Sequence, residues 1–296
     1  MATVAIVGTG RMGSAMARAL AGHGTELLLY NRTPQKARPL ADELGARLID
    51  RLGDASRADV CISMLADAAA VASTWGGSGG LADTAREGSV LVDMSTVPPD
   101  TLLPYEAQVR GAGAGILDAP VSGSTQLAET GKLTIMAGGD GRDLERARPV
   151  LDQLAHTVFH MGRLGSGSAM KLAVNAVIFA LNNAVAEALV LAERAGIDRA
   201  LAYEVIAKSA AGAPFVGYKR EAFVDPDHAP VGFSLDLALK DLALIIALAD
   251  DVGVPVAQAA ANAALIEQTA GRLGGERDFS AVATNLRARA EEGDAD

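Results

Sequence analysis

The chain has 296 residues, of which 50% are hydrophobic and only 4% aromatic, and its formal net charge is −10. This length suffices for two domains with substantial cores. The excess of acidic groups argues against nucleic acid or an anionic membrane surface as a partner. The one cysteine, Cys61, cannot form an internal disulfide, and we expect it to be a small buried side chain in an apolar strand.

The N-terminal segment reads as a strand, Val4–Val7, followed by a glycine-rich turn and a helix over Ser14–Leu20. In such a turn the first glycine permits a tight bend, the second lets backbone approach a pyrophosphate, and the third lets the helix pack against the strand. The helix start adds unpaired N–H groups and a favourable dipole. This pattern predicts a dinucleotide-binding site. The turn residues are Gly8, Thr9, Gly10, Arg11, Met12 and Gly13, and the first five are the predicted cofactor contacts.

The end of the second strand, Glu26–Tyr30, indicates which dinucleotide is bound. In NAD-specific domains an acidic residue at this place binds the ribose 2′-hydroxyl. Here Asn31-Arg32-Thr33 follows, so no carboxylate would repel a 2′-phosphate. Arg32 can pair with that phosphate, and Asn31 and Thr33 can add hydrogen bonds. We predict NADP(H) as the cofactor, with use of NAD(H) left open; a solvated loop arginine is the alternative interpretation of Arg32.

Short apolar runs alternate with helical segments up to about residue 162, which predicts βαβ units and a mostly parallel sheet. The expected strands are Val4–Val7, Glu26–Tyr30, Val60–Met64, Val90–Asp93, Gly115–Asp118 and Leu133–Ala137, with helices at Pro34–Leu44 and Pro98–Gly111. One long helical pattern follows over 168–195, and then helices at Leu201–Ser209, Phe233–Val252, Pro255–Arg272 and Phe279–Ala290. The predicted fold class is α/β: a Rossmann dinucleotide-binding domain over 1–163, then a long interdomain helix and an all-α C-terminal domain over 164–296.

The chain shows no targeting signal that we recognise. It enters its first strand at once, so no signal peptide is expected. No apolar stretch is expected to span a membrane, because Asn182, Asn183 and Glu187 interrupt the longest helix. The expected location is the cytoplasm, and the acidic tail over 291–296 is expected to fray.

A loop over Asp118–Ser124 follows a strand and is rich in small residues. Its backbone N–H groups at Gly123 and its hydroxyls at Ser122 and Ser124 suit a small carboxylate ligand. An ordinary Gly/Ser turn is the alternative interpretation.

Lys171 and Asn175 are four residues apart on the predicted long helix and share a face that continues to Ile178 and Asn182. A lysine here can act as a general acid that protonates a carbonyl oxygen while hydride reaches the carbon. A lysine that extends toward solvent from a helix start is the alternative.

A third charged element, Lys240-Asp241, lies inside an apolar helix, where the pattern alone favours a solvated charge pair. The histidines are scattered, with no metal-like spacing and no triad context, so no metal site is predicted. They are His23, His156, His160 and His228.

Taken together, these segments resemble the β-hydroxyacid dehydrogenase family, which includes 3-hydroxyisobutyrate dehydrogenase, tartronate semialdehyde reductase and glyoxylate/succinic semialdehyde reductases. The resemblance covers essentially the whole chain. It rests on four ordered motifs, at 8–13, 118–123 with 131–139, 165–175 and 240–241. Ser124, where many members carry a second glycine, and the segment 278–282 resemble the glyoxylate/succinic semialdehyde reductases and favour aldehyde reduction.

The resemblance implies a role for each matching residue. Lys171 would be the catalytic proton donor and acceptor, and Asn175 would hold the reacting oxygen or the carboxylate of the substrate. Ser122 and Gly123, with Ser124 beside them, would bind that carboxylate. The residues that would line the cofactor are Leu65, Ala66, Thr96 and Lys240, the last near the nicotinamide.

The predicted reaction is reversible hydride transfer between NADP(H) and a small 3-hydroxy acid or aldehyde acid, with Lys171 as general acid and base. The nearest alternative is an imine reductase-like NADPH-dependent C=N reductase, a family that usually carries Asp or Tyr at the lysine position. A non-catalytic NADP-binding interaction module is an alternative of another class. The expected partners are a small carboxylate or aldehyde substrate and further copies of the chain, as a homodimer or homotetramer.

Overall fold

A computed structural model describes residues 2–292. The chain divides between Lys171 and Leu172 into two compact units. This division falls inside the helix α7 (Ser166–Arg194), whereas the sequence places a domain boundary just before that helix, at 163/164. Of the acidic tail, Glu291 and Glu292 end a helix, and 293–296 lie outside the described residues.

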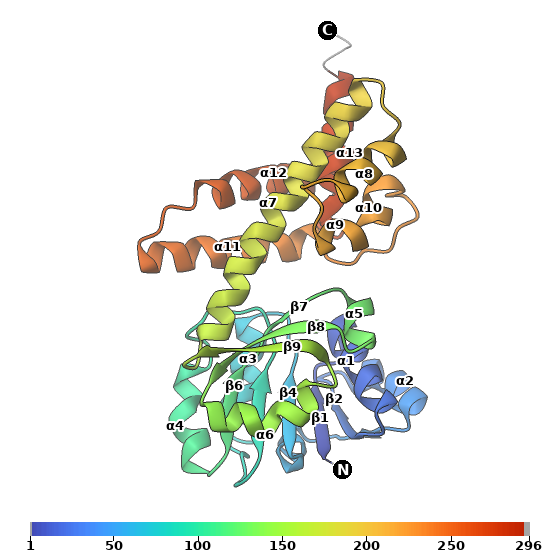
Figure 1. The fold of residues 1–296 in the computed structure, drawn as a ribbon. Coiled ribbons are helices and arrows are strands. Elements are labelled where there is room, and N and C mark those ends of the chain that lie inside the picture. Colours follow the sequence, from blue (N-terminus) through green and yellow to red (C-terminus); the bar gives the residue numbers. More distant parts are fainter. Residues whose placement is uncertain (1, 293–296) are drawn as a thin grey trace. The chain divides into compact units, whose positions relative to one another are not determined.

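The first unit is built on a twisted sheet (Figure 1). Its strands are β1 Thr3–Val7, β2 Glu26–Tyr30, β3 Arg47–Leu48, β4 Val60–Ser63, β5 Val90–Asp93, β6 Gly115–Asp118, β7 Val121–Ser122, β8 Leu133–Gly139 and β9 Ala155–Gly162. Within the described residues they form one sheet in the order β3-β2-β1-β4-β5-β6-β8-β7, and β9 also pairs with β8. Every neighbouring pair from β3 to β6 is parallel, whereas β6 and β7 run antiparallel to β8. The loops after the parallel strands therefore gather at one edge, where ligand sites of open α/β sheets lie.

Helices cover both faces of this sheet. They are α1 Arg11–Gly22, α2 Pro34–Leu44, η1 Leu52–Arg57, α3 Ala68–Trp75, α4 Leu103–Gly111, α5 Thr125–Glu129 and α6 Gly141–Leu151. Along β1, Val4 and Ile6 join one apolar core and Ala5 and Val7 join another, as expected for a parallel strand buried on both sides. Cys61 on β4 is buried as predicted, and burial raises the pKa of its thiol to about 12.

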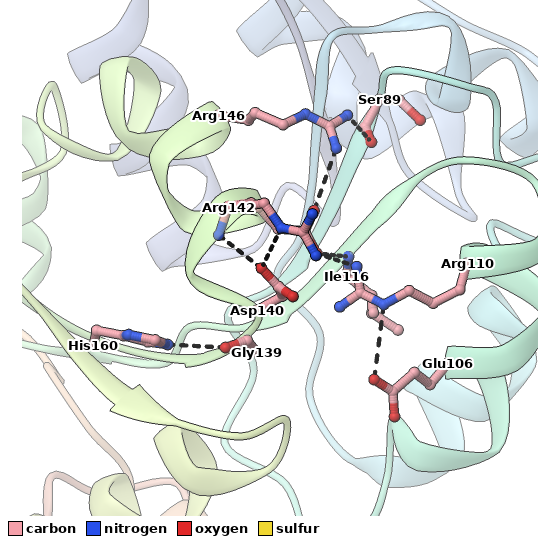
Figure 2. A network of polar contacts seen from close by, with 10 residues as sticks. Ser89, Glu106, Arg110, Ile116, Gly139, Asp140, Arg142, Arg146 and His160 are labelled. Carbon is pink, nitrogen blue, oxygen red and sulfur yellow. Dashed lines mark hydrogen bonds and ion pairs between the residues drawn. The ribbon is translucent and has the colours of Figure 1, made fainter.

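A polar network fastens α4 and α6 to the sheet (Figure 2). Asp143 on α6 is 4% exposed and accepts hydrogen bonds from Arg110 of α4, from Arg146 at 3.3 Å and from the Ile116 N–H of β6 at 3.4 Å. Arg146 also donates to the carbonyl oxygen of Ser89 at 3.0 Å. The buried carboxylate is thus satisfied by two guanidinium groups and one backbone amide.

Two differences from the predicted elements have physical causes. The helix expected to begin at Pro98 begins at Leu103, because residues 99–102 form a turn that starts at the second of two consecutive prolines. Strand β9 was not expected, because Ala155 is its one fully buried residue and its other side chains are partly or fully exposed. Such a strand lacks the apolar alternation by which strands are recognised.

The second unit is helical (Figure 1). Its helices after α7 are α8 Arg199–Lys208, α9 Pro214–Tyr218, α10 Arg220–Val224, α11 Leu235–Val252, α12 Ala257–Leu273, η2 Phe279–Ala281 and α13 Val282–Glu292. At the centre of its core, the ring of Phe279 lies 5.9 Å from Phe179, 5.7 Å from Phe215 and 5.6 Å from Phe233, centroid to centroid. The predicted fold class, a Rossmann domain followed by a helical domain, is confirmed.

Helix α7 is long and strongly apolar. With a mean hydropathy of 1.7 it could cross a membrane by length and composition alone, which corrects the expectation that no stretch would qualify. Yet Asn182 and Asn183 are buried in the helical unit, where they donate to the Phe279 carbonyl oxygen and to Asn262 Oδ1, each at 3.1 Å. These contacts are those of a core helix.

Candidate cofactor and active site

The three glycines of the turn between β1 and α1 have different structural roles. Gly8 has φ +101°, its N–H donates to the Tyr30 carbonyl oxygen at 2.9 Å, and a Cβ there would collide with the carbonyl oxygen of Met64. A Cβ on Gly13 would collide with the carbonyl oxygen of Gly8. A Cβ on Gly10 would meet nothing within 4 Å, and Gly10 caps the start of α1. Open space above a helix start of this kind fits the phosphates of a dinucleotide.

The loop after β2 is tied to this turn. Asn31 Nδ2 donates to Thr9 Oγ1 at 2.7 Å, and Asn31 Oδ1 accepts the Thr33 N–H at 3.0 Å just before α2 begins. Asn31 is therefore a structural link between the two loops as well as a predicted cofactor contact. Arg32 lies between these two anchored residues, just after the end of β2, and is exposed.

The loop after β4 is held by a buried acid at the end of β5. The Leu65 N–H donates to Ser95 Oγ at 2.9 Å, and the hydroxyls of Ser95 and Ser63 donate to Asp93 Oδ1 at 2.9 and 2.6 Å. Trp75 Nε1 in turn donates to Ser63 Oγ at 3.0 Å. Burial raises the pKa of Asp93 to about 6, against the hydrogen bonds from both hydroxyls. The predicted cofactor residues of this region, Leu65 and Ala66 in one loop and Thr96 beside Ser95, thus flank one shared polar network.

The predicted carboxylate loop lies between β7 and α5. Ser122 ends β7, Gly123 has φ +142°, and Ser124 caps α5 by accepting the Leu127 N–H at 3.3 Å. All three loop residues are partly exposed. Gly123 and Ser124 thus lie directly before the start of α5 at Thr125, and part of the surface of each is exposed.

Lys171 follows the start of α7 in the first unit and is partly exposed. The helix start is bound by Asp118 at the end of β6, which accepts the Gly165 N–H at 2.7 Å and the Ser168 N–H at 2.6 Å. Burial raises the pKa of Asp118, and these backbone donors oppose that rise.

In the second unit, Asp241 joins two predicted site residues. Asn175 is buried, and its Nδ2 donates to Asp241 Oδ2 at 2.7 Å, while Lys240 Nζ lies 2.8 Å from Asp241 Oδ1. Asp241 is 1% exposed, so the Lys240-Asp241 pair is not the solvated pair that its pattern favoured. Asn182, on the same predicted helix face, instead belongs to the core through its bond to Phe279.

Three carboxylates in contact with predicted site segments were given no site role of their own by the sequence, although two of them lie in the quoted motifs: Asp93, Asp118 and Asp241. Their common signal is an acid at the end of, or inside, an apolar run, where a charged group must find buried partners. Within residues 2–292, no three His, Cys, Asp or Glu side chains gather as a possible metal site.

Two family models match the chain. Residues 3–162 match the NAD-binding domain of 6-phosphogluconate dehydrogenase, and residues 165–286 match the NAD-binding domain of NADP-dependent 3-hydroxyisobutyrate dehydrogenase. Glyoxylate/succinic semialdehyde reductase 1 of Arabidopsis thaliana is 35% identical over 94% of this chain and 96% of its own length. The 3-hydroxyisobutyrate dehydrogenase of Pseudomonas aeruginosa is 31% identical over 95% of this chain and 97% of its own length.

Solved structures agree with these matches. The 3-hydroxyisobutyrate dehydrogenase of Mycobacterium tuberculosis with L-serine superposes with a TM-score of 0.83 at 31% identity, covering 97% of this chain and 99% of its own. An imine reductase from Pseudomonas sp., at 21% identity and a TM-score of 0.63 over 96% of this chain and 99% of its own, shares the fold. The chain belongs to the β-hydroxyacid dehydrogenase family, as an oxidoreductase that uses a nicotinamide dinucleotide and acts on a CH–OH group.

Proposed function

We propose that this enzyme reversibly interconverts a small 3-hydroxy acid and the corresponding aldehyde acid with NADP(H), using Lys171 as general acid and base. The observation that carries the proposal is Lys171 itself, in the segment 165–175 that resembles the family's catalytic motif. An amine at this position distinguishes the proposal from a C=N reductase, whose family usually carries Asp or Tyr there.

Each residue of the proposed mechanism has a chemical task. In the reductive direction, the Lys171 ammonium donates a proton to the carbonyl oxygen as negative charge develops on it; in the oxidative direction the neutral amine removes that proton. The Asn175 amide, anchored by Asp241, positions the same oxygen or the carboxylate. Ser122 and the N–H groups of Gly123 and Ser124 bind the substrate carboxylate. A nicotinamide, when bound, supplies or accepts the hydride.

The test is Lys171→Ala. We expect kcat for an aldehyde acid to fall at least about 100-fold, because general acid catalysis contributes that much or more. The Kd for NADPH should stay within about twofold, because the glycine turn remains intact. Lys208→Ala, which removes an exposed lysine paired with Glu204, is the matched control and should retain normal turnover. Near-normal kcat in Lys171→Ala would refute the catalytic assignment.

The preference for NADP rests on Arg32, which stands where NAD-specific domains carry an acid. In Arg32→Ala we expect kcat/KM with NADPH to fall about 10- to 100-fold, as for loss of a charge-assisted hydrogen bond, with little change for NADH. Arg38→Ala removes another exposed arginine, on α2, and serves as the control. An equal fall with both cofactors would contradict a contact with the 2′-phosphate.

The substrate class follows from relatives named for glyoxylate, succinic semialdehyde and 3-hydroxyisobutyrate, together with Ser124. The segment 278–282 adds less than its resemblance suggested, because Asp278 and Phe279 are engaged in the core of the helical unit. Measuring kcat/KM for one aldehyde acid beside one cyclic imine, with NADPH, separates the proposed reaction from C=N reduction.

We further propose a cytoplasmic homodimer or homotetramer. Support comes from large apolar side chains exposed on the helical unit, including Val177, Leu191, Leu201 and Val205, each at least 58% exposed. Light scattering at several concentrations tests this proposal, and the molar mass of a single chain at every concentration would refute it.

A further inference from the structure

We propose that Asp118 is a positioning residue for Lys171: its carboxylate fixes the start of α7 and thereby the place of the lysine. This inference rests on the proposed catalytic role of Lys171. Asp118 ends β6, is 2% exposed, and precedes the loop whose serines are assigned to the substrate carboxylate.

Both oxygens of the Asp118 carboxylate are committed to the start of α7. Oδ1 accepts the Gly165 N–H at 2.7 Å and Oδ2 accepts the Ser168 N–H at 2.6 Å. The first N–H groups of a helix have no partner within the helix, and a negative charge is favoured at that end. A two-oxygen contact to two backbone groups restrains both the height and the rotation of the first helical turn.

The surrounding glycines show that this contact requires close approach of backbone. A Cβ on Gly138 of β8 would collide with Asp118 Oδ1, and a Cβ on Gly167 would collide with the carbonyl oxygen of Met136. Gly165 has φ +90°, and a Cβ there would collide with the carbonyl oxygen of Pro99. The first turn of α7 therefore packs closely against β6, β8 and the segment after β5, and this explains the glycines at 165 and 167.

Lys171 is three residues beyond Ser168, less than one helical turn from the carboxylate contact. A helix turns 100° and rises 1.5 Å per residue, so a slip of the first turn by one residue would carry Lys171 to another face. Proton transfer requires the donor within about 3 Å of the oxygen it protonates. By restraining the first turn of α7, Asp118 therefore also restrains the distance between Lys171 Nζ and the substrate oxygen that it protonates.

Asparagine at position 118 would break this arrangement with minimal change of shape. Its Oδ1 can accept one of the two N–H groups, but its NH₂ group would face the other N–H, donor against donor. We expect Asp118→Asn to lower kcat about 10- to 100-fold, as expected for misplacement of a catalytic group by about 1 Å. The Kd for NADPH should change by less than about twofold, because the glycine turn is not touched.

The decisive experiment is a double-mutant cycle of Asp118→Asn and Lys171→Ala, read as kcat. If Asp118 acts through Lys171, adding Asp118→Asn to Lys171→Ala causes no further fall. Equal fold-losses in both backgrounds would overturn the positioning role, as would an unchanged kcat in Asp118→Asn alone. A normal kcat in Lys171→Ala alone would instead refute the proposed function, so the two failures are distinguishable.

Asp143→Asn is the matched control, because Asp143 is also buried in the same unit but binds Arg110 and Arg146 (Figure 2). It should lower the unfolding midpoint without changing kcat. If Asp118→Asn does not fold, Asp118→Ser takes its place: the hydroxyl accepts one N–H and sets no second donor against the other. The same loss of kcat with unchanged NADPH binding is expected, and normal kcat in that variant would overturn the proposal.

Discussion

The acids at the strand ends of the sheet unit and the acid Asp278 of the helical unit are satisfied by different means. In the sheet unit, Asp93 and Asp118 end neighbouring strands and accept hydrogen bonds from hydroxyl and backbone N–H groups. Burial raises the pKa of both carboxyls. In the helical unit, Asp278 lies 2.6 Å from Lys219 Nζ; although burial opposes ionisation, the lysine holds the pKa of Asp278 below its usual range.

This difference shows what a buried acid does at each of these two places. At strand ends, neutral donors orient an acid that in turn holds a loop or a helix start, as Asp93 holds the Leu65 loop. Among packed helices, the Lys219–Asp278 pair is an internal tie: Asp278 also accepts the Gly232 and Phe233 N–H groups at 2.9 and 3.2 Å. The Lys219 ammonium completes the tie by lying 4.4 Å from the centroid of the Phe279 ring.

Breaking the Lys219–Asp278 ion pair should have the largest effect on stability. In Asp278→Asn the Lys219 ammonium stays buried without its anion, and loss of one partner of a buried pair costs about 3–5 kcal/mol. Urea denaturation monitored by circular dichroism measures this loss. Asp227→Asn, with a side chain 80% exposed, is the control. A loss no larger than that of the control would show that Lys219 readily loses its proton or reaches water.

The raised pKa of Asp93 should appear as a pH dependence. Because its pKa rises from 3.8 to about 6 on folding, Asp93 takes up a proton as the protein folds. Its stabilising contribution is therefore complete below pH 4 and is lost as the pH rises through 6. Between pH 3 and 8, Asp93→Asn should gain about 3 kcal/mol relative to the wild type. Unfolding free energies measured across this range test the sign, with exposed Asp100→Asn as control; a flat difference would contradict the burial argument.

The smallest of the three effects concerns Asp241, which binds both a neutral donor, the Asn175 amide, and a charged one, the Lys240 ammonium. In Asp241→Asn the anchors of Asn175 and Lys240 weaken, and one charge-assisted hydrogen bond is worth about 1.5–3 kcal/mol. We expect kcat/KM for the aldehyde acid to fall about 10- to 100-fold. Asp250→Asn, at an exposed position of the same helix, is the control. Unchanged kcat/KM would mean that Asn175 and Lys240 keep their positions without this acid.

Local patterns in the sequence predicted much of the sheet unit. The run Val4–Val7 and the turn at 8–13 are continuous in the chain, and the structure confirms that Gly8 and Gly13 admit no side chain. Strand β9 could not be predicted, because its exposed side chains leave no apolar alternation. The start of α4 differs from the prediction because the turn over 99–102, which begins at the second of two consecutive prolines, precedes the helix.

The long-range pairs of the candidate site and of the helical core lay beyond such patterns. Asp118 and Ser168 are 50 residues apart in the chain, Lys219 and Asp278 are 59 apart, and Asn175 and Asp241 are 66 apart. An acid in an apolar run signals that a partner is needed, but nothing in the run identifies the partner.

The sequence by itself determined the order of elements, the dinucleotide turn and the chemical types available at each motif, because turns and helix faces depend on residues a few positions apart. Only the tertiary structure decided which acid supports which loop. Those contacts depend on which strand ends and helices pack side by side, and burial there removes the water that would otherwise satisfy each charge. Asp118 illustrates both halves: its place at the end of a strand is predicted from the sequence, whereas its two partners at the start of α7 are known only from the fold.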